Sequence, residues 1–181
     1  RREPLPDNKR WTWLSRSHDE GKTWPEVSLV QEGYCGALRD ILQLSTGGLV
    51  LVGQDVANNP GRNFSMTYTS FDDGKTWKRS NNMDIGGHGD HSGTIEGTIE
   101  ELRDGRLWIL LRTYNGCFYE SFSKDKGLTW TYPVPGKIKA SGSPGILRRL
   151  ASGRLVLLWN RFAKNRPRRL GRREELSMAF S

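Results

Sequence analysis

Long hydrophobic stretches are absent from this sequence of 181 residues. The longest uncharged apolar run, Leu107 to Leu111, is far too short to cross a membrane, so no membrane insertion is expected. Cysteine is scarce, because Cys35 and Cys117 are too few for a disulfide framework; two buried free thiols are favoured over a bridge. No stretch repeats apolar residues with the 3.6-residue period of a helix. These absences exclude a membrane-spanning helix, a disulfide scaffold and a helical bundle.

What the chain does contain is enough for one folded core. Hydrophobic residues make up 35% of the sequence, and the 21 glycines bring the combined share of apolar residues and glycine close to that of ordinary globular domains. The net charge is +8, with the excess concentrated in a late run of arginines. A basic chain of this kind can bind nucleic acid, anionic lipid or an acidic small ligand, or simply present a well-solvated surface.

One short motif occurs three times. The pattern S-x-D-x-G-x-T-W begins at Ser17, Ser70 and Ser123, at intervals of 53 residues. A turn explains its composition, because the Asp carboxylate can accept N–H groups of its own turn and Gly supplies a position with positive φ. The Trp is expected to pack the outgoing strand. The motif therefore predicts a repeated β-hairpin turn.

A second repeated element lies between these turns. Residues 41–52, 99–111 and 146–159 each read as an apolar run, a Gly-containing turn and another apolar run, which is typical of a buried hairpin. Each unit therefore holds four strands, and four-stranded sheets repeated every ~40–55 residues are propeller blades. The sequence predicts an all-β propeller with antiparallel blades. The whole chain, 1–181, is expected to be about three blades of one domain, cut in mid-blade at both ends, as a partial and unclosed arc.

The repeated motif resembles the Asp-box, or BNR repeat, of the sialidase (neuraminidase) superfamily. Residues 96–112 resemble a more specific sialidase pattern, E-x-x-x-x-E-L-x-D-G-R-L-x-x-x-x-R. The resemblance implies that Glu96 polarises a nucleophilic Tyr and that Arg112 belongs to a triad of arginines that holds the carboxylate of sialic acid. It also implies a six-bladed propeller, a secreted or periplasmic location, and no cofactor or metal.

Other residues are candidates by their position in the pattern. Arg173 begins an R-x-x-L stretch that resembles the one carrying another triad arginine, and Asp7 precedes a third strand, where the family's acid/base lies. Arg39 and Asn160 are expected to line the pocket. By the same resemblance, the nucleophilic Tyr and the first triad arginine are expected outside these 181 residues, so the chain by itself is not expected to be catalytically complete.

Strand alternation places these candidates together. The hairpin turns and the boxes must lie on one face, here called the box face, and the ends of the inner hairpins on the other, here called the rim. Because Glu96 and Arg112 are symmetric about Asp104, both reach the rim. A three-residue loop, 103–105, would make them direct cross-strand partners on one side of the sheet, whereas a two-residue loop would separate them unless a bulge restores the phase. The three-residue loop is favoured.

Two further clusters have competing interpretations. The segment His88-Gly-Asp90-His91 has zinc-like ligand types, but it lacks a nearby fourth ligand and is favoured as a loop lining the pocket. The Arg-rich segment 161–173 lacks the aromatic residues of a nucleic-acid module, so no nucleic acid is expected. The resemblance predicts an exo-sialidase that acts on a sialylated or acidic glycan. A non-catalytic propeller that binds glycan or protein, or a purely structural one, is the alternative.

Overall fold

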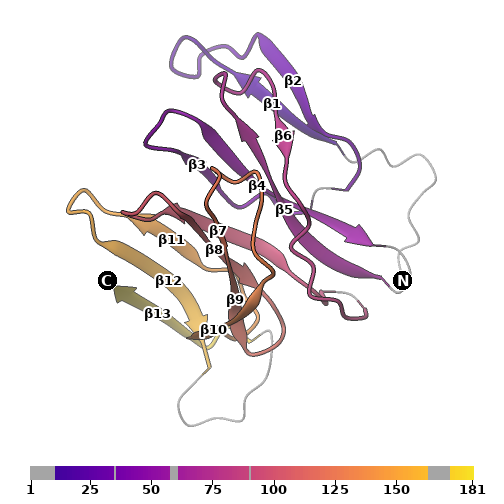
Figure 1. Cartoon of the computed structure of the whole chain (residues 1–181), viewed down its shortest axis with the longest axis vertical. Helices are drawn as coiled ribbons and strands as arrows, with labels where there is room; N and C mark the ends of the chain where they lie inside the picture. Colours follow the sequence, from indigo (N-terminus) through magenta and orange to yellow (C-terminus); the bar gives the residue numbers. More distant parts are fainter. Residues whose placement is uncertain (1–10, 35, 58–60, 90, 163–171) are drawn as a thin grey trace.

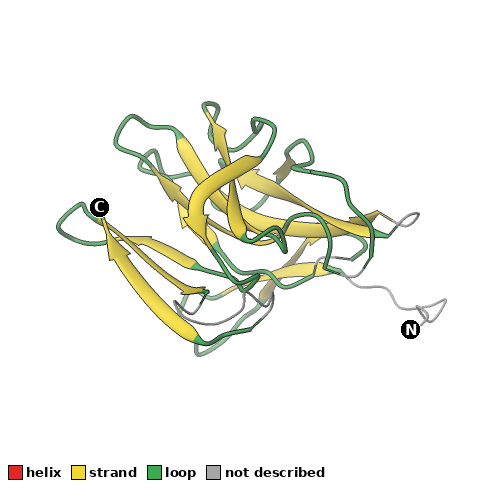
Figure 2. Ribbon diagram, turned by 90° about the horizontal axis from the view of Figure 1, so that it is seen from below, coloured by secondary structure: helices red, strands yellow, loops and turns green. Residues whose placement is uncertain are grey.

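The computed structural model describes residues 11–34, 36–57, 61–89, 91–162 and 172–181. This part of the chain consists of strands and loops without any helix, as Figure 2 shows. Its thirteen strands form four antiparallel sheets, each built from consecutive segments of the chain. The prediction of an all-β fold is confirmed.

The four sheets follow the order of the chain (Figure 1). In the two middle sheets, the four strands are hydrogen-bonded in sequence order, from an inner hairpin outward, as the repeat predicts. The first sheet contains β1 (Thr12–Arg16) and β2 (Glu26–Gln31). The second contains β3 (Ile41–Gln43), β4 (Leu49–Ala57), β5 (Arg62–Ser70) and β6 (Lys78–Arg79). The third contains β7 (Ile95–Glu101), β8 (Leu107–Arg112), β9 (Cys117–Ser123) and β10 (Val134–Lys139). The fourth contains β11 (Ile146–Arg149), β12 (Leu155–Arg161) and β13 (Glu175–Phe180).

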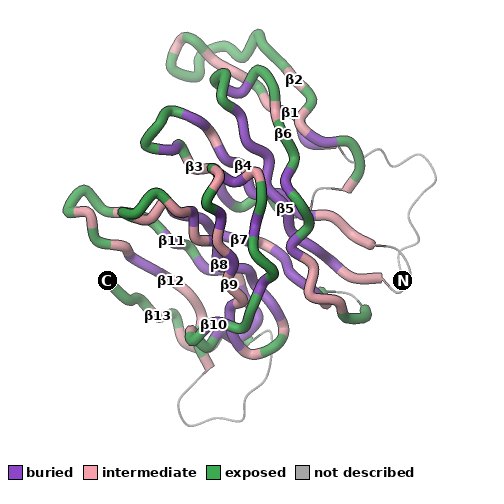
Figure 3. The backbone as a smooth tube through the Cα atoms, viewed as in Figure 1, coloured by how far each residue is buried: buried purple, intermediate pink, exposed green. Residues whose placement is uncertain are grey.

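Apolar side chains fill the space between neighbouring sheets. Val50, Ile109 and Trp130 belong to the core cluster that joins the second and third sheets. Phe118 and Leu147 belong to the cluster between the third and fourth. In Figure 3, the buried residues accordingly lie mainly in the middle sheets. Face-to-face packing of four-stranded sheets around inner strands is the blade arrangement of a propeller.

The first and last sheets lie at opposite ends of the molecule (Figure 1) and expose apolar side chains. Trp13 and Val27 are exposed on the first sheet, and Leu176 and Met178 on the last. The described sheets therefore form an open arc, as predicted, rather than a closed ring.

The three box turns have nearly the same hydrogen bonds. In the second, Asp72 Oδ1 accepts from the backbone N–H of Thr76 at 2.9 Å and Oδ2 from its hydroxyl at 2.6 Å. Ser70 Oγ accepts from Gly74 N at 2.8 Å and donates to Asp72 at 2.8 Å. Gly74 has a φ of 76°, as predicted, but Asp73 before it has a φ of 59°. Two successive positive φ values give the backbone of a type I′ hairpin turn, with a non-glycine residue at its first position.

Each later box also packs on the sheet before it. The hydroxyl of Thr67 on β5 donates to the carbonyl of Gly127 at 2.8 Å and accepts from the indole of Trp130 at 2.8 Å. Arg16 on β1 donates to the carbonyl of Asp73 in the same way. The boxes therefore join neighbouring blades as well as closing their own hairpins.

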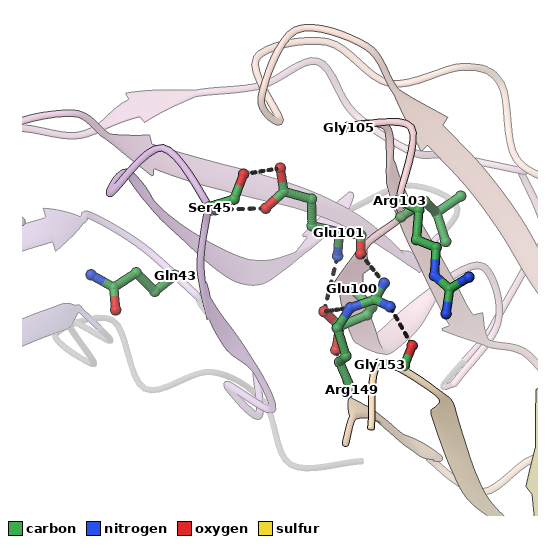
Figure 4. A pocket seen from close by; sticks show the side chains of 9 residues that line it. Gln43, Ser45, Glu100, Glu101, Arg103, Gly105, Arg149 and Gly153 are labelled. Atoms are coloured by element: carbon green, nitrogen blue, oxygen red, sulfur yellow. Dashed lines mark hydrogen bonds and ion pairs between the residues drawn. The ribbon is translucent and has the colours of Figure 1, made fainter. Parts of the chain in front are cut away.

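A hollow of about 530 Å³ lies where the inner hairpins turn, and Figure 4 shows the side chains that line it. Glu101 accepts from the backbone N–H and hydroxyl of Ser45 at 2.6 and 2.9 Å. Glu100 accepts from the backbone N–H of Arg149 at 2.7 Å. These two neighbouring glutamates link the second and fourth sheets to the third, so their role is structural.

Candidate active site

The hairpin that carries Glu96 and Arg112 turns through a three-residue loop. Leu102 N–H donates to the carbonyl of Arg106 at 2.7 Å, which closes a loop of residues 103–105. Within the loop, Gly105 has a φ of 80° and Asp104 accepts from Arg106 N–H at 3.1 Å. The favoured loop length is confirmed, and β7 and β8 pair with the expected register from the turn as far as Thr98 and Leu110.

Beyond Thr98 the register shifts. Arg112 pairs with Ile95, so the prediction that it pairs directly with Glu96 is wrong in this detail. A β-bulge at Glu96 and Gly97 causes the shift, and Glu96 adopts a φ of 46°, which is unusual for a non-glycine residue. The two side chains still meet, because Arg112 Nη1 donates to Glu96 Oε2.

Glu96 is held by a second arginine. Arg39 Nη2 donates to Glu96 Oε1 at 3.1 Å from the loop before β3, and the Glu96 N–H donates to Gln54 Oε1 at 3.2 Å. Burial opposes ionisation of Glu96, but the hydrogen bonds and charges of Arg112 and Arg39 outweigh it, so its pKa is lowered. Glu96 is therefore a carboxylate at neutral pH, shared between two guanidinium groups.

Arg112 is almost buried, with 8% of its side chain exposed. Its Nε donates to the carbonyl of Gly142 at 2.6 Å and its Nη2 to the hydroxyl of Tyr114 at 2.9 Å. Together with the bond to Glu96, three of its five N–H groups are used and two remain. Its guanidinium is thus fixed in place from three directions.

A hollow of about 360 Å³ lies beside this cluster, between the third and fourth sheets. Two predicted pocket residues, Arg39 and Asn160, line it together with Trp159 and Arg148. Asn160 stands near the end of β12, where its carbonyl accepts from Ser141 N–H at 3.0 Å. Because Arg39 also contacts Glu96, the hollow and the Glu96–Arg112 pair form one site, here called the rim site.

The two remaining candidates are Arg173 and Asp7. Arg173 is exposed just before β13, and the rim hollow is lined on that strand by Leu176 instead. Asp7 lies outside the described residues. The roles of both stay predictions. Sequence reasoning missed Tyr114 and Arg148; Tyr114 follows Arg112 by two residues, which is the only signal that pointed to it.

The histidine segment lies partly at the rim site. The His91 ring is 5.8 Å from the ring of Tyr114, His88 is exposed, and Asp90 lies outside the described residues. Cys117 is a buried free thiol, and Cys35 is not among the described residues. Most of the Arg-rich segment, 163–171, also lies outside them. The described part contains no helix that could span a membrane.

Residues 6–181 match the family of BNR repeat-like domains. The chain belongs to that family. Its fold is similar to that of a Hadza microbial sialidase, Hz136, with a TM-score of 0.65 and 20% identity over 94% of this chain and 34% of that one. It is also similar to a variant of the NanB sialidase from Streptococcus pneumoniae, with a TM-score of 0.64 and 20% identity over 94% of this chain and 26% of that one.

A third similar structure is not a sialidase. The α-L-arabinofuranosidase of Fusarium graminearum, solved with arabinobiose, has a TM-score of 0.64 and 16% identity over 98% of this chain and 55% of that one. This BNR repeat-like domain thus shares its fold with glycoside hydrolases of more than one specificity. It spans between about a quarter and about half of the length of these three chains.

Proposed function

We propose that this protein is a glycoside hydrolase that removes a terminal acidic sugar, sialic acid, from glycans, and that the rim site binds the sugar. The observation that carries the proposal is the cluster of Glu96 with Arg112 and Arg39, set at a strained bulge beside the hollow that contains Asn160. An acidic sugar calls for guanidinium groups, since a planar guanidinium binds a carboxylate through two parallel hydrogen bonds.

The two arginines also suggest how Glu96 becomes a base. With the site open, Arg39 and Arg112 keep the pKa of Glu96 low, which makes it a weak base. A substrate carboxylate can compete with Glu96 for Arg39, whose side chain is 43% exposed. When Arg39 binds the substrate instead, Glu96 keeps Arg112 but loses one stabilising partner, and its pKa rises. Substrate binding would therefore activate its own base.

The resemblance assigns the proton that Glu96 accepts to a Tyr nucleophile outside these residues. A Tyr suits this reaction because the oxocarbenium-like centre lies next to the substrate carboxylate, which repels an anionic nucleophile. The general acid that protonates the leaving group remains unassigned among the described residues, and Asp7 stays the candidate from the sequence.

We also propose that residues 1–181 are part of one larger propeller domain. Apolar side chains at both ends of the arc support this, with Trp13 52% exposed and Leu176 74% exposed. Such surfaces are normally covered, and further blades would cover them in the way that the middle sheets cover each other. The proposed activity therefore belongs to the complete protein.

The test is hydrolysis by the full-length protein of three 4-methylumbelliferyl glycosides: the α-sialoside, the α-L-arabinofuranoside and the β-galactoside. Release of fluorophore from the sialoside alone is expected. Turnover of the arabinofuranoside instead would reassign the specificity. Calorimetric binding of N-acetylneuraminic acid without any turnover would overturn the enzymatic proposal and favour a glycan-binding propeller.

A further inference from the structure

The backbone of Glu96 is held by a side chain from another sheet. Its N–H donates to Oε1 of Gln54, on β4 in the second sheet, at 3.2 Å. The bond is made at the bulge, where Glu96 has a φ of 46°. A backbone in such a conformation costs free energy and persists only where the surrounding structure holds it. Gln54 therefore supports the strained backbone of Glu96 from the neighbouring sheet.

Gln54 is the first of two buried amides that form a chain of hydrogen bonds. Its Nε2 donates to Oδ1 of Asn63 on β5 at 3.0 Å, and Nδ2 of Asn63 donates to the carbonyl of Ser92 at 3.3 Å. Gln54 is 6% exposed and Asn63 is 8% exposed. The chain begins at a backbone N–H, which can only donate, and ends at a backbone carbonyl, which can only accept. Both amides therefore have one orientation, because turning either of them would break two bonds.

Asn63 is also fixed through its own backbone. Its N–H donates to the carbonyl of Ser92 at 2.9 Å, and its carbonyl accepts from the N–H of Thr94 at 3.3 Å. These bonds join β5 to the segment before β7. Gly93 lies between the two partners with a φ of 88°, and a Cβ at this position would lie 2.0 Å from the carbonyl oxygen of Asn63. The far end of the amide chain is thus attached to tightly packed main chain.

The loop that carries Arg39 also packs against Gln54. Gly36 in this loop has a φ of 59°, and a Cβ at this position would lie 2.6 Å from Cδ of Gln54. The Gln54 amide therefore contacts this loop, Asn63 and the backbone of Glu96. Gln54 and Asn63 are already buried in the described chain, so further blades are not needed to cover them.

We propose that Gln54, oriented by Asn63, is a positioning residue that holds Glu96 in its reactive place. The proposal rests on the proposed function, in which Glu96 is the general base, and adds to it two residues that act through Glu96. Because φ is the rotation about the N–Cα bond, holding the N–H of Glu96 limits the directions in which its carboxylate can leave the strand. Misplacing a reacting group by about 1 Å can slow a reaction about a hundredfold.

The first experiment compares two glutamine variants of the full-length protein. Gln54→Met removes the acceptor of the Glu96 N–H but nearly keeps the length of the side chain. It is expected to lower kcat for the sialoside by about tenfold to a hundredfold, with KM changed by less than about threefold. Gln31→Met is the matched control, because Gln31 on β2 is also 6% exposed and donates to the carbonyl of Tyr34 at 2.8 Å. The control should lower the melting temperature but keep kcat.

The second experiment measures hydrogen exchange of the Glu96 amide, which does not depend on turnover. Gln54→Met should speed this exchange by about tenfold, whereas exchange at the turn of the same hairpin, 103–105, should stay unchanged. Gln54→Glu keeps an oxygen acceptor of the same reach and should restore the protection. If Gln54→Met does not fold, Asn63→Ala, which removes the group that orients the Gln54 amide, replaces it in both experiments and should shift both readouts in the same direction.

The outcomes separate the positioning role from the proposed function. Unchanged kcat in a folded Gln54→Met variant would overturn the positioning role and leave the hydrolase proposal intact. Equal falls in kcat for Gln54→Met and Gln31→Met would also overturn it, because they would reflect a general loss of folded protein. If the unmodified protein shows no turnover, the hydrolase proposal fails and hydrogen exchange decides alone. Faster exchange at Glu96 in Gln54→Met would then support the positioning of Glu96 by Gln54, and equal exchange would overturn it.

Discussion

The aspartates of the three boxes are held by neutral donors from their own turn, whereas Glu96 and Asp40 are held by arginines distant in the sequence. Asp19, Asp72 and Asp125 each accept from a Thr hydroxyl and a Thr N–H four residues ahead. Glu96 is bound instead by Arg112 on the neighbouring strand β8 and by Arg39 from the loop before β3, and Asp40 by Arg148 on β11.

Under the proposed function, this difference separates structural from functional carboxylates. A turn aspartate surrounded by hydroxyl and backbone donors can be satisfied without a counter-ion, so it stabilises one local conformation. An exposed arginine can exchange its carboxylate for another anion, because a ligand carboxylate offers the same geometry. Under the proposed function, the box turns stabilise the fold, and an exposed arginine at the rim exchanges its anion.

The largest effect that would sharpen this comparison is expected for Glu96→Gln. The variant keeps the size of the side chain but removes the base, so kcat for the sialoside should fall by about 10²–10⁴-fold with little change in KM. The melting temperature should fall, because the variant leaves the nearly buried guanidinium of Arg112 without its carboxylate. Kinetics and thermal unfolding of the full-length protein check both. A fall in stability with kcat preserved would place Glu96 among the structural carboxylates.

The next largest effect concerns the Trp of the boxes. Trp130 is 5% exposed and donates to Thr67 on the neighbouring sheet, whereas Trp24 in the first box is 56% exposed. Trp130→Ala should lower the free energy of unfolding by about 3–5 kcal/mol. Trp24→Ala, the matched control from the same motif, should cost far less. Urea unfolding measures both, and equal losses would mean that the boxes do not stabilise by packing on the preceding blade.

Local patterns could be predicted from the sequence, and contacts between sheets could not. The box turns and the three-residue loop at 103–105 follow from short motifs whose chemistry is contained within a few residues. The bulge at Glu96 has no such signal, because a glutamate rarely adopts a positive φ. It moved the partner of Arg112 by one residue.

The rim site was predicted in part for the same reason. Glu96 and Arg112 were chosen from the resemblance to the sialidase pattern, and Arg39 and Asn160 because strand alternation brings strand ends to one face. The pairing of Asp40 with Arg148 joins residues 108 positions apart on separate sheets, and nothing in either local sequence indicates it. Likewise, the repeat gave each Trp the same role, but burial depends on which sheet lies in front of it.

A smaller effect is expected for Asp125→Ala. The variant removes the acceptor for both donors of Thr129 and loosens the turn whose Gly127 carbonyl accepts from Thr67. It should lower the free energy of unfolding by about 0.5–2 kcal/mol, as does the loss of a comparable side-chain cap. In the folded fraction, kcat and KM should be unchanged, because the box face lies away from the rim site. A loss of turnover with unchanged stability would contradict the division between the faces.

The smallest effect is a change in the pH dependence of stability. Hydrogen bonds from the N–H and the hydroxyl of Thr23, followed by the one from Ser17, lower the pKa of Asp19 to about 2. Hydrogen bonds from Thr76 and Ser70 lower the pKa of Asp72 in the same way. Burial opposes ionisation of Asp125, but the bonds from Thr129 outweigh it and lower its pKa as well. A folded-state pKa below the unfolded value of about 3.9 contributes stability above that pH, and the contribution is lost as the pH falls through the folded value.

Asp72→Asn should therefore be less stable than the unmodified protein at neutral pH, and the gap should narrow as the pH falls from about 4 toward 2. Asp73→Asn is the matched control, because Asp73 is the exposed neighbour whose carboxylate accepts no hydrogen bond within the described residues. Melting temperatures recorded from pH 2 to pH 7 test this. If the difference in melting temperature between Asp72→Asn and the unmodified protein stayed constant across this pH range, Asp72 would stabilise the turn equally well when protonated. The charge of Asp72 would then contribute nothing to the stability of the turn.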